Sequence, residues 1–214
     1  MIEQDFRIYL ITDRAQTGGR PLEKIVEAAF EGGVRALQVR EKDLTSRQLF
    51  ELSLSLRKIT HRYKAQLIIN DRVDIALLAG ADGVHVGRQS IDVKVLRTFV
   101  PEPFIIGVST HSLTEACEAE QGGADFITFG PVYETPSKMK YGPPPGVGAL
   151  KEVCRKVNLP VLALGGINKK EKIKDIKESG AFGIALISGL FQAEDVRAQA
   201  FDFINELEKY NDTY

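Results

Sequence analysis

Cysteine is scarce in this sequence, and long apolar runs are absent. The two cysteines, Cys117 and Cys154, lie far apart and form neither a CxxC pair nor a zinc-ligand spacing, so we expect unpaired thiols in a reducing, cytoplasmic setting. No stretch approaches the ~18 consecutive apolar residues of a membrane helix. The first residues, MIEQDFRIYLITD, lack the basic start and long apolar core of a signal peptide. We therefore expect neither membrane insertion nor secretion.

A strong charge of one sign is also missing. The chain carries 28 Lys and Arg against 29 Asp and Glu, which gives a formal net charge of −1. This balance argues against a nucleic acid or an anionic membrane as partner. It does not exclude a local phosphate site, which needs only a few well-placed donors.

The order of apolar runs predicts one α/β domain spanning residues 1–214, a (β/α)8 TIM barrel of eight parallel strands. The 214 residues suffice for one sizeable core, although ~250 are typical of this fold. Short β-like runs alternate with helix-period segments, as expected for a parallel sheet covered by helices. The expected strands are Ile8–Asp13, Ala36–Arg40, Gln66–Asp71, Val84–Gly87, Phe104–Ser109, Phe126–Gly130, Pro160–Leu164 and Gly183–Ser188.

Local signals support these boundaries. Pro21 opens a helical pattern that the Gly32–Gly33 pair ends, and Thr45 is a suitable N-cap for a helix reaching Arg62. A short motif also recurs, in which small residues and glycine precede an apolar strand. Its copies are EGGVRALQV, LAGADGVHV, QGGADFITF and ESGAFGIAL. We interpret these glycines as helix ends and tight turns into the next strand.

Cationic and amide side chains lie in the second strand and just after it. Gln38 and Arg40 are two residues apart, so both point into the mouth of the barrel, with Lys42 above them. One interpretation is a diphosphate clamp, in which Lys138 of the long loop 131–145 also takes part. The alternative for Arg40 is a buried ion pair with a carboxylate inside the barrel.

Three further strand ends predict a metal and a phosphate site. Asn70 and Asp71 offer the oxygen ligands that Mg2+ prefers, and Asp71 could cap the following helix instead of, or in addition to, binding a metal. The Gly165–Gly166 turn and the Ile187–Ser188–Gly189 turn follow the seventh and eighth strands. Loops at these two positions of a barrel often bind phosphate through backbone N–H groups.

The three histidines call for different interpretations. His61 lies at a helix end and should be a surface residue, whereas His85 lies within a strand and is expected to be a hydrogen-bonded core residue. His111 follows the fifth strand, where it could serve as a general acid or base. Equally, it could simply be a residue of the helix start beside Ser112.

Taken together, these segments resemble the thiamine-phosphate synthase and TenI family almost from end to end. The matching motifs are QVREK at 38–42, INDRVD at 69–74, DGVHVG at 82–87, GVSTH at 107–111, GPVY at 130–133 with Thr135–Lys138, and LGGI at 164–167 with Ile187–Ser188. The resemblance implies a barrel enzyme that joins a hydroxymethylpyrimidine diphosphate to a thiazole phosphate with release of diphosphate, using Mg2+.

The resemblance also implies roles for individual residues. The pyrimidine diphosphate would be held by Gln38, Arg40, Lys42, Asn70, Ser109 and Lys138, and Asp71 would bind Mg2+. The thiazole phosphate would contact Thr135, Pro136, Ser137, Gly166, Ile187 and Ser188. Arg40, Lys42 and Lys138 would act in catalysis by neutralising the leaving group.

One position departs from the synthase pattern. A second Mg2+-binding aspartate is expected where this chain has Ser90, and Asp92 two residues later is an alternative ligand. TenI-like thiazole tautomerases lack several synthase motifs and use a histidine at the position of His111 as acid and base. A thiazole tautomerase and a non-catalytic relative that binds thiazole phosphate or thiamine phosphate are therefore the alternative functions. Self-association into a homo-oligomer is expected from barrel proteins of this size.

Overall fold

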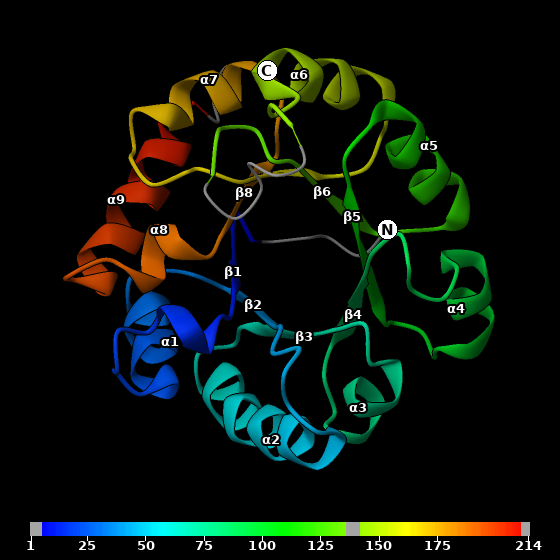
Figure 1. The fold of residues 1–214 in the computed structure, drawn as a ribbon, viewed down its shortest axis with the longest axis vertical. Helices are drawn as coiled ribbons and strands as arrows, with labels where there is room; N and C mark the ends of the chain where they lie inside the picture. The colour runs from blue at the N-terminus through cyan, green and yellow to red at the C-terminus, as the bar shows by residue number, and fades with distance from the viewer. Residues whose placement is uncertain (1–5, 136–141, 211–214) are drawn as a thin grey trace.

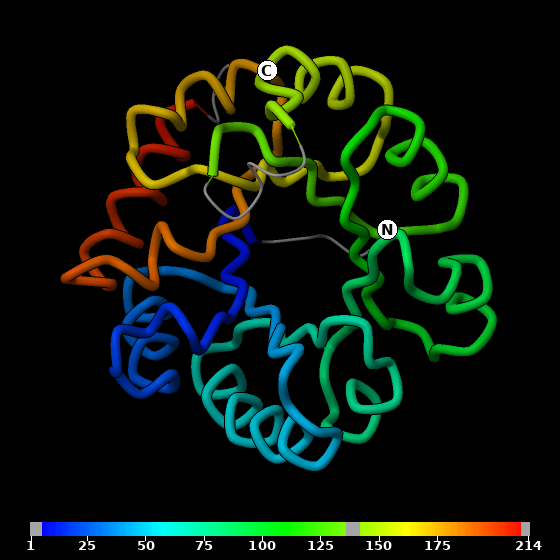
Figure 2. The backbone as a smooth tube through the Cα atoms, viewed as in Figure 1, coloured from blue at the N-terminus to red at the C-terminus, as the bar shows by residue number. Residues whose placement is uncertain are grey.

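Eight parallel strands form a closed barrel in the computed structural model, which describes residues 6–135 and 142–210. Each strand pairs with the next along the chain, and β8 (Gly183–Leu186) closes the barrel against β1 (Ile8–Ile11). Figure 1 looks down the barrel and shows the helices as an outer ring around the strands. The backbone tube in Figure 2 follows the same strand–helix order around the ring. The predicted (β/α)8 fold is thus confirmed.

The helices and strands follow the predicted alternation. The other strands are β2 (Ala36–Val39), β3 (Gln66–Asn70), β4 (Gly83–Val86), β5 (Ile105–Thr110), β6 (Phe126–Phe129) and β7 (Val161–Leu164). The helices are α1 (Leu22–Glu31), α2 (Ser46–Arg62), α3 (Val73–Leu78), α4 (Val93–Phe99), α5 (Leu113–Gly122), α6 (Gly146–Lys156), α7 (Lys172–Glu178), α8 (Ser188–Phe191) and α9 (Val196–Glu208), with a 3-10 turn at Arg14–Gln16.

The local signals act as expected at most boundaries. Thr45 and Gln48 form a reciprocal capping box at the start of α2. In each copy of the repeated motif, one glycine has the left-handed backbone that suits a helix end, with φ of 103° at Gly33, 62° at Gly80, 88° at Gly123 and 90° at Gly180. The prediction was wrong at the eighth strand, because the chain turns at Ile187 and Ser188 begins the short helix α8.

Aromatic side chains fill the inside of the barrel. Tyr9 and Phe126 meet edge to face with ring centroids 5.3 Å apart, and Phe6 packs on Phe126 in the same way at 5.5 Å. A Cβ at Gly107 would lie 2.6 Å from the His85 ring, so this glycine leaves the space that the neighbouring rings occupy. A larger apolar cluster lies between the strands and the helices.

Within residues 6–135 and 142–210, no helix is both long and apolar enough to cross a bilayer.

Candidate active site

A chain of polar side chains crosses the barrel just below its mouth. Gln38 is 2% exposed, and its Nε2 donates a hydrogen bond to the Tyr9 hydroxyl at 3.0 Å. The Tyr9 hydroxyl lies 3.4 Å from Nδ1 of His85, and Nε2 of His85 lies 2.9 Å from the Ser109 hydroxyl. Because the strands are parallel, four side chains from β1, β2, β4 and β5 meet in one layer. Gln38 and Ser109 are thus held by buried partners rather than by solvent.

His85 is neutral in this layer. Burial lowers its pKa to about 3, and the positive charge of Arg40 acts in the same direction. A neutral ring can accept the proton of Tyr9 at Nδ1 and donate from Nε2 to Ser109. The expectation of a hydrogen-bonded core histidine is confirmed.

The neutral state of His85 should make the protein less stable in acid. An unfolded histidine has a pKa of ~6.5, so between that value and about 3 only the unfolded chain binds the proton. The free energy of unfolding must therefore fall as the pH is lowered through this window. We expect wild type to lose about 2 kcal/mol more than His85→Gln between roughly pH 7 and pH 5 in urea unfolding. Equal losses in the two proteins would contradict this assignment.

Arg40 is a cation without a counter-ion among the described residues. Its backbone N–H donates to the Thr12 hydroxyl at 2.9 Å, which fixes the chain just after β2. No described side chain forms a hydrogen bond or ion pair with its guanidinium, so the alternative of a buried Arg40–carboxylate pair is wrong for the part of the chain that the structure covers. The charge of Arg40 contributes to the lowered pKa of His85 inside the barrel. Lys42 is exposed beyond it.

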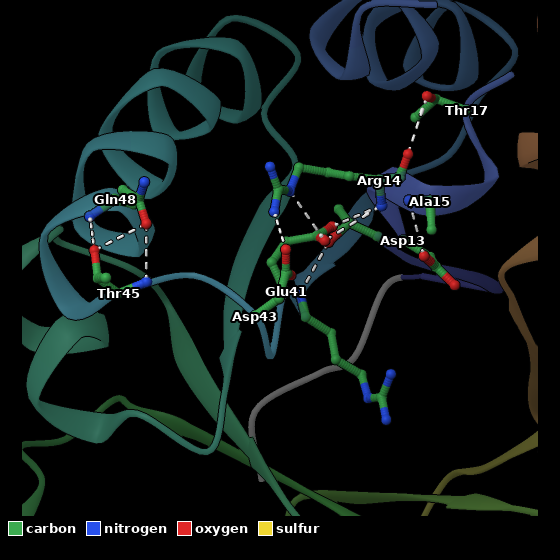
Figure 3. Close-up of polar contacts among 10 residues, drawn as sticks. Asp13, Arg14, Ala15, Thr17, Glu41, Asp43, Thr45 and Gln48 are labelled. Carbon is green, nitrogen blue, oxygen red and sulfur yellow. Dashed lines mark hydrogen bonds and ion pairs between the residues drawn. The ribbon is translucent and has the colours of Figure 1, made fainter. Parts of the chain in front are cut away.

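The acid next to Arg40 in sequence is bound elsewhere. Glu41 is 7% exposed and accepts hydrogen bonds from the backbone N–H and from Nε of Arg14, each at 3.2 Å. Arg14 also pairs with Asp43 at 2.6 Å. Figure 3 shows Arg14 between the two carboxylates, with Asp13 capping its own turn nearby. Arg14 thus neutralises Glu41 and leaves Arg40 available for an anion.

Asp71 presents a free carboxylate at the end of β3. Its backbone is left-handed, with φ of 64°, and its N–H donates to the His85 carbonyl at 2.9 Å. The alternative that Asp71 caps the next helix is wrong, because Arg72 is the N-cap residue of α3 and no side chain caps it. The Asp71 carboxylate is exposed and forms no hydrogen bond or ion pair within the described residues. Asn70, half-buried at the last position of β3, adjoins it.

Ser90 and Asp92 both have structural roles of their own. The Ser90 hydroxyl accepts a hydrogen bond from the Gly87 N–H at 2.8 Å and so closes the turn after β4. Asp92 caps α4 by accepting from the Lys94 N–H at 2.8 Å. Among the residues that the structure describes, no three His, Cys, Asp or Glu side chains form a metal-binding group. Within the described part of the chain, Asp71 is therefore a single carboxylate and not one of a cluster of metal ligands.

The loops after β6, β7 and β8 pack against one another. Gly165 and Gly166 have φ of 102° and 68°, and the Tyr133 N–H donates to the Gly165 carbonyl at 3.1 Å. Lys172 holds the same turn by donating to the Gly166 carbonyl at 2.6 Å. Gly189, at the start of α8, lies so close to the Ile167 carbonyl that a side chain would not fit. The two predicted phosphate-binding turns are thus neighbours, and Ser188 lies in the first turn of α8.

Gly166→Ala should disturb this turn. An added Cβ would lie 2.6 Å from the Glu134 carbonyl oxygen and would hold alanine in a left-handed conformation. Strain and overpacking together should cost roughly 2–5 kcal/mol in chemical denaturation. Gly148→Ala in α6 is the matched control, because its Cβ would meet nothing within 4 Å. Unchanged stability of Gly166→Ala would show that the loops can move apart.

His111 lies on the rim between β5 and α5. Its side chain is exposed, and Nδ1 forms a short hydrogen bond with the Gly130 carbonyl, which orients the ring. If Nδ1 carries the proton for that bond, Nε2 remains free to accept one. Ser112, not His111, caps α5. The acid–base role of His111 stays a prediction.

Some predicted residues fall in the long loop after β6. Thr135 is half-buried at the end of the described segment. Pro136, Ser137 and Lys138 lie outside the described residues. Tyr9 and Arg14 had not been predicted as parts of the site. Their types are common in cores and turns, and only the closed barrel brings them beside β2.

Comparisons with known proteins agree with this geometry. The family model TMP-TENI, described as thiamine monophosphate synthase, matches residues 8–190. A protein from Geobacter sulfurreducens named "Putative thiamine-phosphate synthase" is 50% identical over 200 residues, which are 94% of this chain and 93% of the relative. The thiamine-phosphate synthase of Clostridium novyi is 37% identical over 94% of this chain and 98% of its own.

A solved structure gives the same result. The thiamine phosphate pyrophosphorylase of Pyrococcus furiosus superposes with a TM-score of 0.87 at 36% identity, covering 96% of this chain and 97% of that one. A 3-hexulose-6-phosphate synthase, 16% identical with a TM-score of 0.72, shares the fold. From the matched residues, the extent of the identity and the superposition, the chain belongs to the thiamine monophosphate synthase family.

Proposed function

We propose that this chain, acting as a single barrel domain, is a thiamine-phosphate synthase, a transferase of thiamine biosynthesis. Its substrates would be hydroxymethylpyrimidine diphosphate and a thiazole phosphate. The observation that carries the proposal is a pair of charged groups at the mouth, the Arg40 guanidinium and the Asp71 carboxylate, neither of which forms a hydrogen bond or ion pair with a side chain of the described residues. A site that must stabilise a departing diphosphate needs a free cation and a ligand for its counter-ion.

The proposed reaction requires neutralisation of the charge on the departing diphosphate more than it requires covalent catalysis. The bond between the pyrimidine methylene carbon and the diphosphate oxygen breaks, and both electrons leave on oxygen. The lone pair of the thiazole nitrogen then forms the new carbon–nitrogen bond. Arg40, Lys42 and Lys138 would bind the leaving diphosphate, while Gln38, Asn70 and Ser109 would hold the pyrimidine.

The donors around Asp71 fit a Mg2+ ion that arrives with the diphosphate. In proteins this ion commonly takes one or two carboxylates and completes its shell with water and substrate phosphates. When bound, it would add positive charge to the leaving group. Asp71 would hold it, with the amide oxygen of Asn70 close by, and Ser90 would contribute only a neutral hydroxyl.

The loops after β6, β7 and β8 would bind the thiazole phosphate. Support comes from the left-handed glycines of the β7 turn and from the contact between Gly189 and the Ile167 carbonyl. Backbone N–H groups of Gly166 and Ser188 have no hydrogen-bond partner within the described chain, so they could donate to phosphate oxygens. Thr135, Pro136, Ser137 and Ile187 would complete this subsite.

The test is formation of thiamine phosphate from both substrates by purified protein, with and without Mg2+. Mg2+-dependent product supports the proposal, and no product under saturating conditions contradicts it. The tautomerase alternative would then be examined by isomerisation of the thiazole substrate in wild type and His111→Ala. Binding of thiazole phosphate without turnover in either assay would indicate the non-catalytic relative.

Ser90→Asp should lower the Mg2+ concentration that the reaction needs. A carboxylate at position 90 would add a second charged ligand near Asp71 and could still accept the Gly87 N–H. We expect the half-saturating Mg2+ concentration to fall by about tenfold, which corresponds to ~1.4 kcal/mol. Ser90→Asn, similar in size but uncharged, is the control. An unchanged Mg2+ requirement would place the ion away from residue 90.

Two broader expectations remain proposals. A cytoplasmic location is supported by Cys117 and Cys154, which are both free thiols. Self-association is supported by exposed apolar side chains on neighbouring α3 and α4, where Leu78 is 73% and Phe99 66% exposed.

A further inference from the structure

A surface cavity lies at the opposite end of the barrel from the proposed active site. It is widely open to solvent and has a volume of about 360 Å³. Arg7, Pro160 and Phe182 line it, and each directly precedes a strand, β1, β7 or β8. They therefore mark the N-terminal face. Helices α6 and α7, which lie side by side in Figure 1, supply Cys154 and Lys177.

Two cations are fixed side by side in this cavity. Nη1 of Arg7 donates to the Phe182 carbonyl at 3.0 Å, and its guanidinium lies 4.0 Å from the centroid of the Phe182 ring. Nζ of Lys177 donates to the carbonyl of the preceding residue, Ala181, at 3.3 Å. Consecutive carbonyls thus hold the two positive charges together, and the other N–H donors of both groups form no hydrogen bond within the part of the chain that the structure describes.

No acidic side chain lines the cavity, and neither cation has an ion-pair partner within the described residues. Burial and the charge of Arg7 both lower the pKa of Lys177. Burial raises the pKa of the Cys154 thiol to about 11, so that group is neutral at pH 7. Asn158, also in the lining, donates to Glu120 outside the cavity at 3.2 Å and neutralises neither cation. Among residues 6–135 and 142–210, two cations are thus brought together with no acidic side chain to offset their repulsion.

We propose that this cavity binds a small phosphate-bearing molecule between Arg7 and Lys177. A planar guanidinium with free N–H groups matches the oxygens of phosphate, and an ammonium group adds a second charge-assisted hydrogen bond. Phe182 and Val161 would contact the non-polar part of the ligand. The site is separate from the mouth, so a ligand bound there would stabilise the fold without taking part in the chemistry.

The test is a titration of the full chain with inorganic phosphate at constant ionic strength, followed residue by residue by 1H–15N NMR. We expect saturable shifts of the amides of residues 177–183, separate from those of Gly166 and Ser188 at the mouth. Lys177→Gln and Arg7→Gln should each weaken the binding at residues 177–183 by about tenfold. Lys174→Gln, on the same helix but ion-paired with Glu178, should leave it unchanged.

Other results would overturn the proposal. Shifts confined to the mouth amides, or a linear response at residues 177–183, would show that the cavity does not bind phosphate. If Lys174→Gln weakened phosphate binding at residues 177–183 as much as the other two substitutions, the effect would reflect the loss of any nearby positive charge and not a specific site. Equal affinity for acetate would overturn the assignment to phosphate. Because unaffected amides report the fold of each variant, loss of binding by unfolding would be recognised.

Discussion

Arg40→Gln is expected to reduce kcat/KM for thiamine phosphate formation by ~1,000-fold, with most of the loss in kcat. Loss of one preorganised group that stabilises charge in the transition state commonly costs ~100- to 1,000-fold. Arg40 is the cation that no described carboxylate offsets, so its whole charge is available to the departing diphosphate. Steady-state kinetics with both substrates at saturating Mg2+ measures the effect.

Two further variants separate charge from geometry. Arg40→Lys keeps the positive charge but loses the planar pair of donors, so we expect it to recover only part of the activity. Arg47→Gln removes an arginine from the exposed side of α2, forms no described contact, and should leave the kinetics unchanged. Activity within a few-fold of wild type in Arg40→Gln would mean that another residue neutralises the leaving group.

The Arg40→Gln substitution should lower activity without lowering the free energy of unfolding. When one residue of a buried ion pair is replaced, its partner remains as an uncompensated buried charge, which costs several kcal/mol of stability. Arg40 has no such partner among the described residues, and its charge lowers the pKa of His85. Removing it should therefore leave the unfolding free energy at pH 7 nearly unchanged. Comparing the two effects distinguishes an arginine that binds a ligand from one that stabilises the fold.

The strand order could be predicted from the sequence because local signals repeat along it. The motif around Gly33, Gly80, Gly123 and Gly180 marks a helix end just before a strand, and all four residues have the left-handed backbone that this requires. The polar positions also followed from strand periodicity and from the rule that parallel strands end on one face. Gln38 and Asp71 were found in this way without any contact being known.

Pairings between side chains could not be predicted. Glu41 directly follows Arg40, yet its partner is Arg14, 27 residues earlier on the neighbouring loop. Nothing in either segment specifies that choice, because it depends on how β1 and β2 align in the closed barrel. The link from Tyr9 to His85 likewise joins β1 to β4 across the interior. Such contacts decide which charges remain free, and they appear only in three dimensions.

The short helix α8 and the left-handed backbone of Asp71 could not be predicted from the sequence either. Four residues of α8 give too little periodicity to distinguish a helix from the end of a strand. At Asp71, the sequence allowed a helix cap or a metal ligand, and both use an oxygen of the same side chain. The structure excludes the cap, because Asp71 has a left-handed φ of 64° and the N-cap position of α3 is Arg72. The metal-ligand role stays a prediction.

Asp71→Asn is expected to lower activity by about 100-fold or more at low Mg2+ and to raise the half-saturating Mg2+ concentration. Charge stabilisation by a bound divalent ion is worth several kcal/mol, and ~1.4 kcal/mol is tenfold in rate. Asparagine is the right substitute, because after glycine it is among the residues that best tolerate a left-handed backbone. The variant removes the charge of the carboxylate and keeps the turn.

Titration of Mg2+ in the kinetic assay gives the decisive comparison. A ligand role predicts that excess Mg2+ restores part of the activity of Asp71→Asn, since the substrate phosphates still bind the ion. A purely structural role predicts lower stability and no rescue. Asp92→Asn removes the same charge nearby and keeps a good helix cap, so its Mg2+ dependence should match wild type. If Asp92→Asn instead shifts that dependence while Asp71→Asn does not, the ion binds on the β4 loop, and the β3 end serves only to hold the pyrimidine.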